Sequence, residues 1–266
     1  MKLGFIGGGN MAYAICGGVL SSGLLNAENI TVNDTNEAAL AKFKEQNVAV
    51  SCDVSAITEC DYIILAVKPH IVPIALENLA EKYKEKIKNT VFISIAAGIS
   101  VSFIKEHLGF DAKVIRIMPN TPALVGEGMS VIAGALAPVA DEEFENVKKI
   151  FESVGKIEVM PESMLNAVIA ISGSSPAYVF MLIEAMADAG VRDGLSRDTA
   201  YRLAAQSVLG SAKMVLETGK HPGELKDMVC SPKGTTIEAV AQLEESGFRN
   251  AIISAMKKCT DKANNI

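Results

Sequence analysis

Short apolar runs alternate with amphipathic stretches through the first half of the chain. Apolar runs of about four to seven residues are typical of strands in a parallel sheet covered on both faces, whereas apolar residues at every third or fourth position are typical of helices. Repeated strand–helix units predict an α/β fold with a doubly wound (Rossmann-type) parallel sheet. Strands are expected at residues 3–6, 30–34, 61–67, 90–95, 113–118, 128–133 and 156–160, and helices up to residue 25 and at 36–46, 72–87, 100–108 and 141–154.

The pattern changes at Pro161, after which no further strand is expected. We therefore predict an α/β domain at residues 1–160 and an all-helical domain at residues 161–266. Ser196 is a candidate N-cap, and Gly219 is a candidate helix stop. Helices are predicted at 164–189, with a break near Gly173–Pro176, and at 196–217, 222–229, 235–245 and 247–263.

One segment of the helical half, Ser163 to Ile183, carries no charged residue and is long enough to span a membrane. Asn166, Pro176 and the polar Ser172–Ser175 cluster interrupt it, which favours a helix buried in protein over a membrane span. A helix that is apolar around most of its circumference needs cover on every side. Because a small helical domain supplies little of that cover, we expect a homo-oligomer, in which a partner subunit supplies the rest.

Composition limits the classes of partner. The 266 residues carry a net charge of −6, which argues against a nucleic-acid partner. Five cysteines and three histidines are scattered along the chain without a C-x-x-C pair, so neither a disulfide framework nor a metal site is expected. A reduced, cytoplasmic location is the simplest interpretation.

The apolar run from Leu3 to Ile6 ends at three consecutive glycines, and a run of small and apolar residues follows. Strand, glycine turn and helix together place the free N–H groups and the positive dipole end of a helix where a pyrophosphate binds. In the pattern G-x-G-x-x-A, Gly7 makes the tight turn, Gly9 lets the phosphates approach the backbone, and Ala12 keeps the helix close to the strand. The loop predicts a dinucleotide site, with a tight strand–helix turn as the alternative.

Other residues near the expected ligand lie at the carboxyl ends of the strands, because ligands of doubly wound sheets bind there. Small side chains at Ala66, Ala96 and Ala97 would let a flat ring approach the backbone. Asp34 closes the second strand, where a carboxylate would accept hydrogen bonds from the adenosine ribose and repel the 2′-phosphate of NADPH. A turn aspartate without a ligand is the alternative.

A second candidate anion site lies at residues 231–236, Ser-Pro-Lys-Gly-Thr-Thr, immediately before an apolar helix. Free N–H groups, hydroxyls and a positive dipole end suit a carboxylate, although a well-capped helix start would show the same residues. The motifs G-x-S-x-G and H-E-x-x-H do not occur, and His70, His107 and His221 are interpreted as surface or capping residues. The sequence thus offers binding groups without an acid–base set.

Six segments resemble the pyrroline-5-carboxylate reductase family, in the family's order: residues 6–12, 66–69, 94–98, 116–122, 172–178 and 231–237. Many dehydrogenases share the glycine loop, whereas Ser231–Ile237 is the specific segment. The resemblance implies reduction of 1-pyrroline-5-carboxylate to L-proline by NAD(P)H, the final step of proline synthesis. It also implies a helical C-terminal domain that forms a dimer, sometimes assembled further.

The resemblance implies roles for individual residues as well. The pyrophosphate would be held by Gly7, Gly9, Asn10 and Met11, while Ala66 and Lys68 would lie along the cofactor and Ala96 and Asn120 near the nicotinamide. The substrate carboxylate and ring nitrogen would be held by Ser231, Gly234, Thr235 and Thr236, with the Thr236 hydroxyl as the catalytic hydrogen-bonding group. A cyclic imine protonates readily, so its reduction needs positioning more than an enzyme base.

Several positions depart from the family's pattern. Asn33 and Asp34 stand where relatives that use NADPH tend to place Arg or Ser, and Asp53 stands where an asparagine contacts the ribose side of the cofactor. We therefore expect NADH to be at least as good a cofactor as NADPH. Lys233 replaces a glycine of the substrate loop, and Ser175 replaces a glycine before Pro176.

Two other functions are weighed against this one. A 3-hydroxyacid dehydrogenase of the 6-phosphogluconate type would use a lysine on the first long helix of the second domain, but no lysine occurs between Met164 and Leu195. A non-catalytic dinucleotide-binding regulator would leave the loop at residues 231–236 without a role.

Overall fold

The computed structural model describes residues 1–134 and 138–264, which form two compact units. The first unit comprises Met1–Ser174 together with the chain from Cys259 onward, and the second comprises Ser175–Lys258. The last strand ends at Met160, where the predicted α/β domain ends. The first compact unit nevertheless continues through the short helical segments that follow, and it takes in the end of the final helix.

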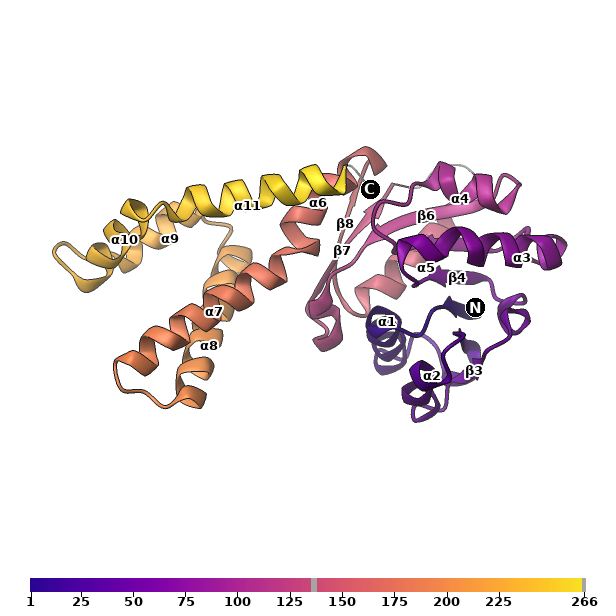
Figure 1. Cartoon of the computed structure of the whole chain (residues 1–266), viewed down its shortest axis with the longest axis horizontal. Coiled ribbons are helices and arrows are strands. Elements are labelled where there is room, and N and C mark those ends of the chain that lie inside the picture. The colour runs from indigo at the N-terminus through magenta and orange to yellow at the C-terminus, as the bar shows by residue number, and fades with distance from the viewer. Residues whose placement is uncertain (135–137, 265–266) are drawn as a thin grey trace. The chain divides into compact units, whose positions relative to one another are not determined.

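A sheet forms the middle of the first unit (Figure 1). It has eight strands, in the order β3–β2–β1–β4–β5–β6–β7–β8. The first six strands are parallel, and the order of the strands reverses at β1, which lies between β2 and β4. The strands are β1 (Leu3–Ile6), β2 (Ile30–Asn33), β3 (Ala49–Ser51), β4 (Tyr62–Leu65), β5 (Val91–Ser94), β6 (Lys113–Met118), β7 (Gly128–Ala133) and β8 (Gly155–Met160).

The mostly parallel α/β fold is confirmed, with two differences. Strand β3 was not predicted, because three residues with one large apolar side chain are too short for a pattern. Strand β7 runs antiparallel to β6 and parallel to β8, which corrects the expectation of a wholly parallel sheet. Only a short 3₁₀ helix, Thr121–Val125, separates β6 from β7, and a parallel pair would need a longer crossover.

Helices cover both faces of the sheet (Figure 1). On one face α1, α2 and α5 bury Ile15, Phe43 and Phe151, and on the other α3 and α4 bury Leu76 and Ile104. Because consecutive strand residues point to opposite faces, cover on both faces explains the continuous apolar runs. These helices are α1 (Asn10–Ser21), α2 (Glu37–Lys44), α3 (Val72–Ile87), α4 (Val101–Leu108) and α5 (Asp141–Glu152).

The predicted break in the long apolar helix is a π-helical turn, Ile169–Gly173, between α6 (Leu165–Val168) and α7 (Ser175–Arg192). The Ser174 N–H donates to the carbonyl of Ile169, five residues earlier, over 2.8 Å. Pro176 has no N–H to donate to the carbonyl of Ser172, four residues before it. Asn120, in the connection after β6, donates its Nδ2 to that carbonyl instead, over 3.0 Å, and so satisfies the interrupted helix.

The second unit contains helices only, in the part of it that the structure describes. Helices α7 and α8 (Arg197–Thr218) pack side by side (Figure 1), and an ion pair between Asp188 and Arg197 joins them. The predicted cap and stop of α8 are confirmed, since the Ser196 side chain accepts from the Thr199 N–H and Gly219 has a φ of +63°. Three further helices follow: α9 (Pro222–Val229), α10 (Thr235–Glu245) and α11 (Phe248–Ala263).

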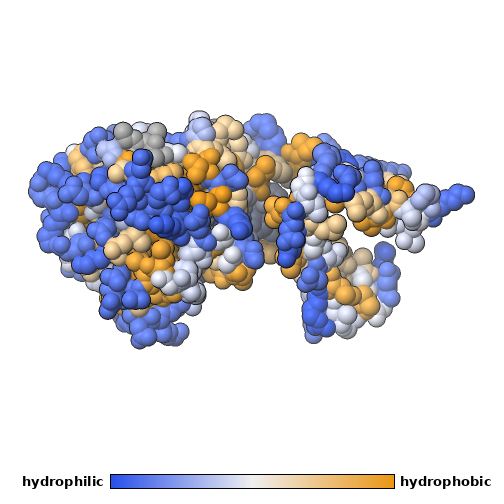
Figure 2. Space-filling view, turned by 180° about the vertical axis from the view of Figure 1, so that it is seen from behind, coloured by the Kyte–Doolittle hydropathy of each residue, from blue (hydrophilic) through white to orange (hydrophobic). Residues whose placement is uncertain are grey.

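Large apolar side chains are exposed on the helices of the second unit (Figure 2). Phe180 and Met181 on α7 are 63% and 69% exposed, and Leu216 on α8 is 83% exposed. Among the described residues, one helical segment, Glu162–Arg192, is long and apolar enough to cross a membrane by length and composition alone, a test that a core helix of a soluble protein also passes. The chain by itself thus leaves much of α7 uncovered, as the sequence predicted.

Candidate functional site

The glycine loop lies at the carboxyl end of β1, where the strand order reverses. Gly7 has a φ of +103°, and a Cβ atom there would lie 2.7 Å from the Ala66 carbonyl oxygen and 2.8 Å from Val67 Cγ1. Only glycine therefore lets the loop pass so close to the end of β4. The tight turn predicted at Gly7 is confirmed.

Gly9 is free of such contacts, since a Cβ atom there would meet no atom within 4 Å. It is the N-cap of α1, which begins at Asn10, and no side chain caps this helix. Asn10 is exposed and Met11 is half-buried, whereas Ala12 is fully buried against the sheet. The first residue of the helix is thus exposed to solvent, while Ala12 packs against the sheet. This arrangement fits a pyrophosphate.

Asp34 is held at the carboxyl end of β2 by two backbone donors. Its Oδ2 accepts from the Gly8 N–H over 2.7 Å, and its Oδ1 accepts from the Asn36 N–H over 2.8 Å. The buried Asn33 side chain has a different task, because its Nδ2 donates to the Ser51 carbonyl of β3. The carboxylate of Asp34 is therefore fixed next to the glycine loop, as a group that binds ribose hydroxyls requires.

A cleft of about 380 Å³ opens beside this carboxylate, and Gly7 and Asp34 both line it. Val67, Ile71 and Ile74 give it an apolar wall, and Ile71 and Ile74 are exposed despite being apolar. The sequence did not single out Ile71 and Ile74; their only signal is that they follow the end of β4.

Asp53 and Lys82 are the other charged residues that line this cleft, together with Asp34. Asp53 Oδ1 accepts from the Ser55 N–H over 2.9 Å, and this hydrogen bond lowers the pKa of Asp53, so the carboxyl stays ionised at neutral pH. Two carboxylates and one ammonium thus face the space that an adenosine would fill. The charged side chains that line the cleft thus carry a net negative charge.

The residues predicted to lie along the cofactor and near its nicotinamide differ in their burial and hydrogen bonding. Ala96 is buried just after β5, and Lys68 is exposed at the start of a short 3₁₀ helix outside the residues that line the cleft. Asn120 is buried, and its Oδ1 accepts from the Met129 N–H over 2.8 Å while its Nδ2 serves the Ser172 carbonyl. Both ends of that amide are engaged within the protein, so Asn120 acts as a support for the π-helical turn.

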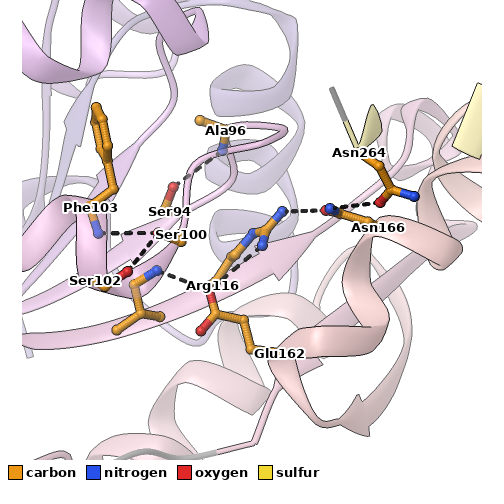
Figure 3. Close-up of polar contacts among 10 residues, drawn as sticks. Ser94, Ala96, Ser100, Ser102, Phe103, Arg116, Glu162, Asn166 and Asn264 are labelled. Atoms are coloured by element: carbon orange, nitrogen blue, oxygen red, sulfur yellow. Dashed lines mark hydrogen bonds and ion pairs between the residues drawn. The ribbon is translucent and has the colours of Figure 1, made fainter. Parts of the chain in front are cut away.

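A buried arginine of β6, Arg116, lies opposite Ser94, the last residue of β5 (Figure 3). Arg116 Nη2 donates to Asn166 Oδ1 over 3.1 Å, and its Nη1 lies 3.6 Å from Glu162 Oε1, which also accepts from the Val101 N–H that begins α4. Asn166 in turn donates to Asn264 Oδ1 over 3.2 Å. Burial lowers the pKa of Arg116, and the charge of Glu162 opposes that effect. This cluster fastens α4, α6 and the end of α11 to the sheet; its signal in the sequence is a single charge inside an apolar strand.

The second candidate site lies in the second unit, between α9 and α10. The Gly234 N–H donates to the Ser231 carbonyl over 3.0 Å, which closes a four-residue turn. A Cβ atom on Gly234 would lie 2.3 Å from Ser231 Oγ, so the turn brings this hydroxyl against the backbone. Gly234 is the N-cap of α10 and has no side chain to accept from the first N–H groups of the helix.

The predicted substrate residues therefore gather in one loop. Thr235 is exposed and Thr236 is half-buried in the first turn of α10, where helix N–H groups lack partners within the helix. The N–H of Gly234 is engaged in the turn, so this residue contributes shape rather than a donor. The cofactor candidates belong to the first unit and the substrate candidates to the second.

His221 has the capping role expected from the sequence, whereas His107 is half-buried within α4 and caps no helix in the described part of the chain. The His221 side chain accepts from the Gly223 N–H at the start of α9, and His107 Nδ1 lies 2.8 Å from the Phe103 carbonyl oxygen in α4. Within residues 1–134 and 138–264, no group of three or more His, Cys, Asp and Glu side chains is arranged to hold a metal ion.

Two family models match the chain. The model for pyrroline-5-carboxylate reductase dimerisation matches residues 162–266, and the model for NADP oxidoreductase, coenzyme F420-dependent, matches residues 2–98. The pyrroline-5-carboxylate reductase of Escherichia coli K12 is 51% identical over 267 residues, which covers 98% of this chain and 97% of that protein.

Solved structures give the same result across the whole length. A pyrroline-5-carboxylate reductase from Coxiella burnetii is 32% identical, with a TM-score of 0.88 over 99% of this chain and 97% of the other. The Plasmodium falciparum pyrroline carboxylate reductase with NADP bound is also 32% identical, with a TM-score of 0.89 over the same shares of both chains.

Proposed function

The chain belongs to the pyrroline-5-carboxylate reductase family, and from this premise we propose that the protein reduces the C=N bond of 1-pyrroline-5-carboxylate to give L-proline, in proline biosynthesis. It is an NAD(P)H-dependent oxidoreductase that acts on CH–NH groups. The observation that carries this conclusion is 51% identity to the Escherichia coli enzyme over 98% of the chain. Membership of this family decides against the dehydrogenase and the non-catalytic regulator weighed from the sequence.

The dimerisation domain at residues 162–266 implies a homo-oligomer. It coincides with the helices whose apolar side chains are exposed in the single chain, Phe180 and Met181 among them. A second copy of the chain is the partner that would bury these side chains.

The first unit carries an NADP-binding type of domain. When bound, a reduced nicotinamide coenzyme supplies the hydride. We propose that the glycine loop and the open start of α1, from Gly7 to Met11, hold its pyrophosphate, and that Val67, Ile71 and Ile74 pack against its adenine. Asp34 and Asp53 would accept hydrogen bonds from the ribose hydroxyls, since both are fixed beside the cleft by backbone N–H groups.

We also propose that NADH is at least as good a cofactor as NADPH. A 2′-phosphate beside Asp34 would meet a carboxylate whose two oxygens are already oriented by the Gly8 and Asn36 N–H groups. Like charges in such proximity raise the free energy of the complex. Among the residues that the structure describes, Lys82 on α3 is the one cation that lines the cleft, against two carboxylates.

The loop at residues 231–236 would hold the substrate. The Ser231 hydroxyl and the N–H groups of Thr235 and Thr236 suit the carboxylate, because they stand at the positive end of the α10 dipole. The Thr236 hydroxyl would hydrogen-bond to the ring nitrogen. A protonated imine accepts hydride at carbon directly, so this chain needs to orient the ring and fix its carboxylate rather than supply a base.

Purified protein tests the proposal directly. We expect oxidation of NADH, followed at 340 nm, to depend on added 1-pyrroline-5-carboxylate and to yield proline in equal amount. Piperideine carboxylates, with the larger ring, measure how closely the site fits the five-membered ring. Cofactor binding without any imine reduction would contradict the function, and a KM for NADPH far below that for NADH would contradict the cofactor preference.

A further inference from the structure

Lys233 adopts a backbone conformation that its side chain disfavours. Its φ is +60°, and the only other non-glycine residue with a positive φ among the described residues is Asn47. Asparagine tolerates this region because its short side chain bonds to the local backbone, whereas lysine has no such compensation. Lysine at this position therefore lowers the stability of the folded protein relative to glycine.

The turn explains why glycine would be the neutral choice at this position. The Gly234 N–H donates to the Ser231 carbonyl, with Pro232 second and Lys233 third in the turn. Proline at the second position and a positive φ at the third are the features of a type II turn, which favours glycine at the third position. The fold of the loop thus requires no lysine.

Charge gives a second cost in the protein without ligand. Lys233 is exposed and immediately precedes Gly234, the N-cap of α10. The residue thus adds a positive charge to the loop at the positive end of a helix dipole, where cations are destabilising. No acidic side chain in the part of the chain that the structure describes lies within 4.0 Å of the Lys233 ammonium. A bound anion would attract both the Lys233 ammonium and the positive end of the α10 dipole, and so would offset the repulsion between them.

We propose that Lys233 is a specificity-determining residue of the substrate site, whose ammonium attracts the carboxylate of the cyclic imino acid. The inference rests on the proposed function, because it takes the loop at residues 231–236 to be the carboxylate site. The lysine side chain is long enough to reach the carboxylate that the Ser231 hydroxyl and the Thr235 and Thr236 N–H groups would hold. Imines with a carboxylate on the ring are favoured by it over imines without one.

Replacement by glycine removes the charge of the lysine and relieves its positive φ, and the two effects are measured by different quantities. In Lys233→Gly the KM for 1-pyrroline-5-carboxylate should rise about three- to tenfold at low salt, the range expected for one partly screened charge. The difference should shrink in about 0.5 M salt, where the Debye length is only a few ångströms. Turnover and the KM for NADH should change less than twofold, while the Tm without ligand should stay level or rise by about 2 °C because the strained φ is relieved.

Two further variants serve as controls. Lys233→Arg keeps the charge and should keep the low KM, whereas Lys233→Asn tolerates the positive φ without a charge and should behave as the glycine variant does. An unchanged KM in Lys233→Gly at low salt, or a fall in turnover with an unchanged KM, would overturn the inference. Failure of the unmodified protein to reduce the imine would instead overturn the proposed function.

Discussion

At the scale of single residues, Asp34 decides what the adenosine end of the cleft accepts. Its carboxylate is oriented by two backbone N–H groups at 2.7 and 2.8 Å and lines the cleft. Replacement by asparagine keeps the size of the side chain and removes the charge, although its single amide oxygen can accept from only one of the two N–H groups. We expect Asp34→Asn to raise the ratio of kcat/KM for NADPH to that for NADH by about tenfold, because the repulsion of the 2′-phosphate is lost.

Asp61→Asn is the matched control for this prediction. Asp61 also accepts from a backbone N–H at 2.7 Å, that of Lys2, but it precedes β4 and therefore lies at the opposite end of the sheet from the cleft. The control variant should leave the ratio unchanged, as measured by initial rates with both cofactors. An Asp34→Asn enzyme with the original ratio would show that Asp34 is only a turn residue.

Thr236 carries the one catalytic role that the proposed mechanism assigns to a side chain. Thr236→Val preserves the branched shape in the first turn of α10 and removes the hydroxyl. We expect turnover to fall about tenfold or more through loss of a hydrogen bond to the charged imine, with the affinity for NADH unchanged. Steady-state kinetics and cofactor titration measure the two quantities separately, and unchanged turnover would refute the role.

At the scale of elements, two adjacent glycines in α1 differ in the space around them. A Cβ atom on Gly18 would lie 2.3 Å from Val154 Cγ1 and 2.7 Å from the Ser153 carbonyl oxygen, whereas one on Gly17 would meet only Gln46 Nε2 at 3.8 Å. Gly18 thus allows α1 to pack closely on the segment that leads into β8, and Gly17 does not serve packing.

A pair of alanine variants tests this difference. We expect Gly18→Ala to lower stability by about 2 kcal/mol through overpacking, which is a fall in Tm of roughly 4–8 °C. Gly17→Ala should raise stability by about 0.5 kcal/mol, because alanine is the better helix former and meets no obstacle. Thermal unfolding followed by circular dichroism compares them, and equal effects at both positions would contradict the packing argument.

At the scale of the whole molecule, we expect the exposed apolar side chains of α7 to form part of the interface between subunits. Phe180 is 63% exposed in the single chain and lies within the dimerisation domain. We expect the protein to sediment as a dimer or larger at micromolar concentration, and Phe180→Asp to shift it towards the monomer, because a buried unpaired carboxylate costs several kcal/mol.

Asn89→Asp adds the same charge at an exposed turn of the first unit and should leave the sedimentation coefficient unchanged. A monomeric profile for the unmodified protein would contradict the expectation of a partner subunit. Sedimentation of Phe180→Asp as the full oligomer would place the interface on other side chains of the helical domain.

The sequence by itself determined what depends on neighbours along the chain. Hydrophobic periodicity placed nearly all the strands and helices. Ser196 and Gly219 marked the start and the end of α8, and the structure confirms both. The turn at Gly7 was also predictable from neighbouring residues, because a tight turn from a strand into a helix has a recognisable glycine pattern. These features rest on hydrogen bonds and dihedral angles within a few residues.

Tertiary structure alone decided which distant groups meet. The pairing of β3 with β2, the two hydrogen bonds of the Asn120 amide and the hydrogen bond from the Gly8 N–H to Asp34 each join residues nine or more positions apart. The positive φ of Lys233 was equally hidden, because a turn imposes a dihedral angle on whichever residue occupies it. Local patterns fix local bonds, whereas the contacts that shape this site depend on how the whole chain packs.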